Sequence, residues 1–132
     1  MALPYLACMM MAANYYHLPP RVLPSIHAVE GGYAGAVIPD SNGTADLGVM
    51  QINTTWIQPL SRYAHMQPAA VAGRLIHDPC FNVAAAGLIL YSYITQRHES
   101  LMDAVGHYHS HTPLLKMTYE AKVVQAADTL FR

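Results

Sequence analysis

The chain has 132 residues, of which 53% are apolar and 11% are charged, and its net charge at pH 7 is −1. This composition is too apolar for a disordered chain, and the length suits a single domain, residues 1–132, with one sizeable core. The charge lacks the basic excess of nucleic-acid-binding proteins, so we expect no nucleic acid as a partner.

Helical patterns dominate the chain and enclose one segment of different character. In chain order, the first helix is followed by Pro19 and Pro20, which open a second that ends near Glu30 because Gly31 and Gly32 follow directly. Apolar residues at helical spacing and proline or capping residues at the starts mark the others. The predicted helices span residues 7–16, 19–30, 55–60, 69–75, 79–98, 100–107 and 113–130.

Residues 33–53 interrupt the helices. A turn cluster, Pro39-Asp40-Ser41-Asn42-Gly43, lies between two short apolar segments at residues 35–38 and 47–50. This arrangement predicts a small β-hairpin or an ordered loop. The fold class expected is mainly α with a small β-hairpin.

No stretch of the sequence is a candidate membrane span. The longest apolar run, residues 80–94, is interrupted by Asn82 and Ser92 and is shorter than the roughly 20 residues that a bilayer requires. The apolar start, MALPYLACMMMAA, lacks the positive region of a signal peptide. We therefore expect a mature exported domain in which no signal peptide is visible.

The two cysteines, Cys8 and Cys80, leave two interpretations open. Both can be buried free thiols. A disulfide between them would close a loop of about seventy residues and stabilise the fold by roughly 4 kcal/mol through the entropy of the unfolded chain. It would also imply an oxidising compartment such as the periplasm.

Glu30 and Asp46 are the candidate catalytic acids. Glu30 ends an apolar helix just before two glycines, so partial burial would raise the pKa of its carboxyl and suit it to general acid catalysis. The alternative is a solvated glutamate at a helix end. Asp46 lies across the predicted hairpin, which can fold the two acids together. Two carboxyls in unlike environments are what glycoside cleavage uses.

The segment 46–56, DLGVMQINTTW, interleaves hydrogen-bonding and apolar side chains. If it is extended, Gln51 and Asn53 project to one side, and their amides suit a ligand rich in hydroxyls. Met50 and Ile52 then face the core, although a bend can return Met50 to the cleft. We expect Trp56, at the end of this segment, to pack into the core.

Three motifs in order resemble the soluble lytic transglycosylases (SLT domain) of the lysozyme superfamily. That family has Glu-Ser-Gly, then Gly-Leu-Met-Gln-Ile, then an Ala-Tyr-Asn type of motif. Here the corresponding residues are Glu30-Gly31-Gly32, Gly48-Val49-Met50-Gln51-Ile52 and Gly106-His107-Tyr108-His109. The run Asp78-Pro79-Cys80-Phe81-Asn82 and Cys8 are similar to the small transglycosylases of secretion and conjugation systems, whose two cysteines form a disulfide.

This resemblance, which runs from about Cys8 to Val123, implies an α+β lysozyme-like fold and a monomeric periplasmic enzyme without a cofactor. It also implies cleavage of the MurNAc-GlcNAc β-1,4 bond of peptidoglycan to give 1,6-anhydromuramic ends. A secretion-apparatus protein is the second partner that the resemblance implies, with local opening of the cell wall for a secretion, pilus or conjugation apparatus as the role.

The resemblance also assigns roles to single residues. Glu30 matches the catalytic acid and base, and Asp46 matches an acid that stabilises the oxocarbenium-like transition state. The remaining matches are residues that hold the glycan or lie beside the catalytic glutamate: Met50, Gln51 and Tyr108. His109, the last substrate-binding candidate, replaces the family's usual asparagine, as is common in the secretion-linked subgroup.

Two alternatives stay open. Asp46 together with Glu30 allows hydrolysis as a muramidase. Gly31 replaces the family's serine, and the loss of that hydroxyl favours a weakly active scaffold that binds glycan. His107, His109 and His111 alternate as zinc ligands can, but without a His-Glu-x-x-His motif we predict no metal.

Overall fold

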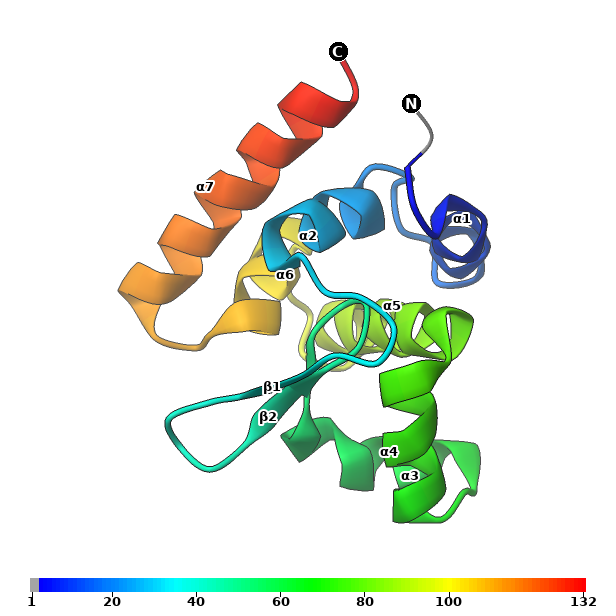
Figure 1. Cartoon of the computed structure of the whole chain (residues 1–132). Coiled ribbons are helices and arrows are strands. Elements are labelled where there is room, and N and C mark those ends of the chain that lie inside the picture. The colour runs from blue at the N-terminus through cyan, green and yellow to red at the C-terminus, as the bar shows by residue number, and fades with distance from the viewer. Residues whose placement is uncertain (1–2) are drawn as a thin grey trace.

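Helices form most of the computed structural model, which describes residues 3–132 (Figure 1). The helices are α1 (Leu6–Tyr15), α2 (Val22–Glu30), α3 (Ile57–Ala64), α4 (Pro68–His77), α5 (Pro79–Gln96), α6 (Leu101–His109) and α7 (Pro113–Leu130). A 3-10 helix, η1 (Thr54–Trp56), precedes α3. The predicted fold class, mainly α with a small hairpin, is confirmed.

Local signals in the sequence set the starts of two helices that border the site. The Asp78 side chain accepts a hydrogen bond from the Phe81 amide at 3.1 Å, and proline occupies the first position of α5. The Ser100 hydroxyl caps α6 in the same way by accepting from the Asp103 amide at 3.1 Å. Such caps satisfy backbone groups that have no partner within the helix.

A three-stranded antiparallel sheet replaces the simple hairpin. Its order is β1 (Val37–Pro39), β2 (Ala45–Leu47) and β3 (Ile52–Asn53). The hairpin of β1 and β2 extends away from the helices (Figure 1). Asp46 lies in the middle strand, opposite Ile38 on one side and Asn53 on the other.

The second strand of the prediction, residues 47–50, was placed too far along the chain. Residues 48–51 form a turn instead, in which Gly48 and Gln51 both have positive φ, 69° and 54°. The Gln51 amide donates to the Gly48 carbonyl at 3.2 Å. The turn reverses the chain and directs Met50 into the core.

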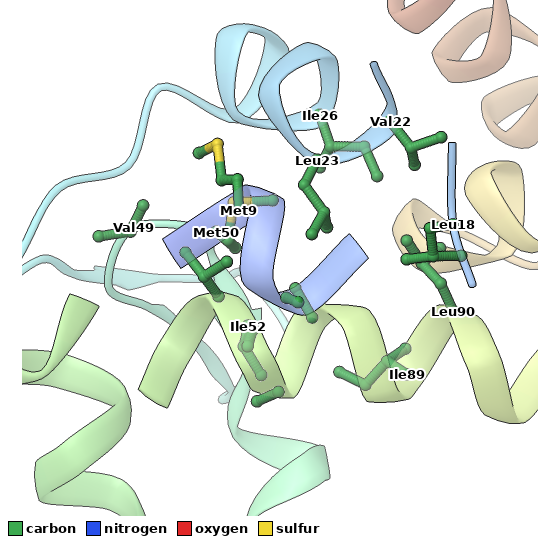
Figure 2. Packing of buried hydrophobic residues seen from close by; sticks show 14 of the residues in the cluster. Met9, Leu18, Val22, Leu23, Ile26, Val49, Met50, Ile52, Ile89 and Leu90 are labelled. Atoms are coloured by element: carbon green, nitrogen blue, oxygen red, sulfur yellow. The ribbon is translucent and has the colours of Figure 1, made fainter. Parts of the chain in front are cut away.

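The core lies between α1, α2, α5 and the turn after β2. Its fully buried side chains include Met9, Leu23, Met50 and Leu90. Figure 2 shows these side chains converging from the separate segments. This packing fixes the turn of residues 48–51 against α2, the helix that ends at Glu30.

A disulfide joins Cys8 in α1 to Cys80 at the start of α5, which confirms the pairing interpretation of the two cysteines. It spans 72 residues of sequence. No helix in residues 3–132 has both the length and the apolar character needed to cross a bilayer.

Candidate active site

A groove of about 870 Å³ opens beside the sheet, a volume in the range of sites that bind small molecules. Its walls come from the end of α2, the strands, the second half of α5 and the end of α6. Six of the seven residues predicted for catalysis or substrate binding line it: Glu30, Asp46, Gln51, Asn53, Tyr108 and His109.

Glu30 is the last residue of α2, and Gly31 ends the helix by donating its amide to the His27 carbonyl at 2.8 Å. Burial raises the pKa of the Glu30 carboxyl to about 7. The nearby charge of Asp46 raises it further, whereas the Tyr119 hydroxyl lowers it. A carboxyl with this pKa is about half protonated at neutral pH, so a large fraction of the protein has a general acid ready to donate its proton.

The two positions after Glu30 require glycine for different structural reasons. Gly31 has a φ of 68°, so the family's serine would be strained at this backbone conformation. At Gly32 a side chain would collide with the carbonyl oxygens of Gly48 and Val49. The backbone after Glu30 thus lies directly against the turn that carries Gln51.

Asp46 lies in a polar setting. The amide nitrogen of Asn53 donates to Asp46 at 3.0 Å, to Asp40 at 3.0 Å and to the Thr44 hydroxyl at 2.9 Å. Burial raises the pKa of Asp46, the hydrogen bond from Asn53 lowers it, and the adjacent Asp40 raises it again. Sequence reasoning missed Asp40, which it assigned to the hairpin turn.

Gln51 and Asn53 are both partly engaged within the protein. The Gln51 side-chain amide donates to the Gly48 carbonyl at 3.1 Å, and the residue lines the groove. The Asn53 oxygen accepts from the Thr55 amide at 3.0 Å and caps η1. Asn53 therefore organises the strands in addition to lining the groove.

Met50 is the exception among the predicted site residues. Its side chain has no exposed surface and does not line the groove, so the structure does not support the predicted contact with substrate. The physical reason is the turn, which directs the Met50 side chain into the core. The backbone amide of Met50 donates a hydrogen bond to the Asn82 side-chain oxygen at 2.8 Å. Its backbone carbonyl accepts the Tyr108 hydroxyl at 2.7 Å.

Tyr108 links the second and third motifs through that hydrogen bond. Burial raises the pKa of its hydroxyl well above the ordinary value, and the charges of Glu30 and Asp46 act in the same direction. Tyr108 is thus a neutral group in the wall next to both acids.

Tyr119 in α7 is a second residue that sequence reasoning missed. Its helical spacing from Leu115 and Val123 puts Tyr119 on an apolar face of α7, and its side chain is buried. Its hydroxyl lies close enough to Glu30 for each group to shift the pKa of the other, yet it forms no hydrogen bond within residues 3–132. The His109 ring stacks on it at 4.6 Å between centroids.

The three alternating histidines separate in the structure. His107 and His111 stack on each other at 4.6 Å, whereas His109 packs on Tyr119. Within residues 3–132 no group of three or more His, Cys, Asp or Glu side chains is arranged to hold a metal ion. Trp56 is partly buried, as expected of a core residue, but it also lines the groove.

In a comparison with protein-family models, residues 7–121 match the model described as the transglycosylase SLT domain. The matched segment includes Glu30, the turn of residues 48–51 and Tyr108. The helical fold with a small sheet agrees with the lysozyme-like fold of that family. No curated protein matches the chain.

Proposed function

The chain belongs to the transglycosylase SLT domain family, whose members are peptidoglycan lytic transglycosylases, and we propose that its groove binds a glycan strand that Glu30 cleaves. Peptidoglycan is the substrate and the reaction class is that of a lyase. The position of Glu30 in the wall of the groove, together with Asp46, is the observation that carries the proposed catalytic role, and burial supports it by raising the pKa of Glu30 to about 7.

The first step of the proposed reaction is proton donation. The Glu30 carboxyl gives its proton to the oxygen that joins C1 of N-acetylmuramic acid to N-acetylglucosamine. The C1–O bond breaks with its electron pair on that oxygen, and C1 acquires oxocarbenium character. Burial favours the protonated form of Glu30 before this step, because it disfavours the charged carboxylate.

The second step closes a ring and consumes no water. Glu30, now a carboxylate, takes the proton of the C6 hydroxyl of the same muramic acid while that oxygen bonds to C1. The product is a 1,6-anhydromuramic end, and Glu30 regains its proton for the next cycle. Gln51 and Tyr108 border the reacting sugar in this proposal, because they line the groove beside Glu30.

The position of Asp46 suits two roles: stabilising positive charge during transglycosylation, and hydrolysis, which is the second candidate function. It lines the same groove as Glu30 and its charge acts on the Glu30 carboxyl. An ionised Asp46 would stabilise positive charge at C1 in either reaction. Water entering at C1 in place of the C6 hydroxyl would give a reducing end, as a muramidase does.

The proposed location is the periplasm, and the proposed role is local opening of the cell wall for a secretion, pilus or conjugation apparatus. The disulfide between Cys8 and Cys80 supports an oxidising compartment. The role is supported by the resemblance of the motifs around Cys8 and residues 78–82 to small transglycosylases of such systems.

Product analysis of digested sacculi tests the proposal. Mass spectrometry should find anhydromuramic ends with the wild-type protein and none above background with the Glu30→Gln variant. Glu120→Gln, which removes a glutamate on α7 outside the groove, should give wild-type products. Reducing ends would replace the proposal with hydrolysis, and full activity of Glu30→Gln would remove Glu30 from the mechanism.

A further inference from the structure

One wall of the groove carries aromatic and cationic side chains that cleavage of the sugar bond does not use. We call Tyr93, Arg97, His107 and His111 the cationic wall. Tyr93 comes from α5, Arg97 is the residue that ends α5, and the two histidines come from the end of α6 and the segment after it. All four line the groove.

Tyr93 is the centre of this wall. Its ring lies 5.9 Å from the His107 ring and 5.9 Å from the His111 ring, measured between centroids. The Arg97 guanidinium carbon lies 6.0 Å from the Tyr93 centroid, at the limit of a cation–π contact. The groups are therefore held by one buried ring.

His107 is also held in place by contacts with Glu99 and His111. Its Nδ1 lies 2.7 Å from the carboxylate of Glu99, whose side chain is largely buried, and its ring stacks on His111 at 4.6 Å. Glu99 is thus already paired with an imidazole. His111 Nε2 lies 3.4 Å from the Tyr93 hydroxyl, so the ring nitrogens left for a hydrogen bond to a ligand are Nε2 of His107 and Nδ1 of His111.

Arg97 has no acidic partner among the residues that the structure describes. None of the ion pairs formed within residues 3–132 includes it, and its side chain is exposed. It is also the one lysine or arginine that lines the groove in this part of the chain, whereas the acids there are Glu30, Asp40 and Asp46. A neutral sugar gives such a guanidinium no counter-charge.

We propose that the cationic wall binds a carboxylate of the peptide stems carried by the glycan strand, an inference that rests on the proposed function. In an intact strand the lactyl carboxyl of muramic acid is joined to the stem in a neutral amide. The free carboxylates of the substrate therefore lie on the peptides. A planar guanidinium pairs with a carboxylate through two parallel hydrogen bonds, and the imidazoles add further donors.

The test compares the same glycan with and without peptides. Initial rates at low substrate give kcat/KM on intact sacculi and on strands stripped of their stems by an amidase. For Arg97→Gln we expect the ratio of the two values, intact over stripped, to fall about tenfold, the effect of one lost charge-assisted hydrogen bond. Arg97→Lys, which keeps the charge, should retain most of the ratio.

Arg74→Gln is the matched control. Arg74 is also exposed and lies over an aromatic ring, that of Phe81 at 5.4 Å, but it is outside the groove. Its ratio should equal that of the wild type. A wild-type ratio in Arg97→Gln, or equal losses on both substrates, would overturn the inference. Failure of the wild-type protein to release anhydromuramic ends from either substrate would instead contradict the proposed function.

Discussion

The two acids of the groove lie on sides of opposite character. The helical side, formed by α2 and α7 around Glu30, offers that carboxyl burial and a tyrosine hydroxyl that forms no hydrogen bond within residues 3–132. The strand side, residues 37–53, surrounds Asp46 with the side chains of Asn53, Asp40 and Thr44. Burial raises the pKa of both acids, and one polar neighbour opposes it on each side: the Tyr119 hydroxyl lowers the pKa of Glu30, and the hydrogen bond from Asn53 lowers that of Asp46.

The two surroundings explain how carboxyl groups of the same kind can take two roles in one groove. Burial favours the protonated form of Glu30, which suits that carboxyl to give a proton to a substrate oxygen. At Asp46 the hydrogen bond from Asn53 opposes the effect of burial and favours the charged form, which can oppose a positive charge. We therefore expect the loss of Glu30 and the loss of Asp46 to change the activity of the protein to different extents.

The largest effect expected is on activity. Glu30→Gln should lower kcat on sacculi by about a thousandfold, because it removes the proton donor. Asp46→Asn should cost at most about a hundredfold, because it removes only a stabilising charge. Timed release of soluble muropeptides measures both. If the loss in Asp46→Asn were the greater, the strand side would hold the proton donor and the assignment of the two sides would be reversed.

An intermediate effect is expected on stability, and it depends on pH. The folded protein raises the pKa of Glu30 from 4.5 to about 7, so ionisation of Glu30 destabilises the fold progressively above pH 4.5 and fully above pH 7. Glu30→Gln should therefore raise the free energy of unfolding at pH 8 by about 2–3 kcal/mol relative to its effect at pH 4.

Denaturant unfolding of wild type and variant at the two pH values measures this gain. Glu120→Gln serves as the control for removing a glutamate beyond the groove. An equal effect of Glu30→Gln at both pH values would mean that the helical side does not hold the carboxyl in its neutral form.

The helical side was the easier of the two to predict from sequence. The glycines after Glu30 are local signals that end α2, and the proline at residue 113 is a local signal that begins α7. The motif order also brought both acids into the predicted site. These features depend on a few neighbouring residues, which a sequence displays directly.

The remaining features depend on contacts between distant parts of the chain. Met50 turns inward because of a positive φ at Gly48 and a hydrogen bond to Asn82, 32 residues away. Tyr119 lies beside Glu30 because α7 packs against α2. Helical spacing puts Tyr119 on an apolar face of α7, but a pattern of burial does not show which polar group its hydroxyl will meet.

The smallest effect expected is a shift in the pH dependence of kcat, and variants on the two sides should shift it in opposite directions. Wild-type kcat should fall as pH rises through about 7, because Glu30 loses the proton it must donate. Tyr119→Phe removes a hydroxyl that lowers the pKa of Glu30, so this limb should move to higher pH. Asp46→Asn removes a charge that raises that pKa, so the limb should move to lower pH. Each shift should be less than about one pH unit, and rates of muropeptide release from pH 5 to 9 measure it. Shifts in the same direction would show that the two groups do not act on Glu30 from opposite sides of its titration.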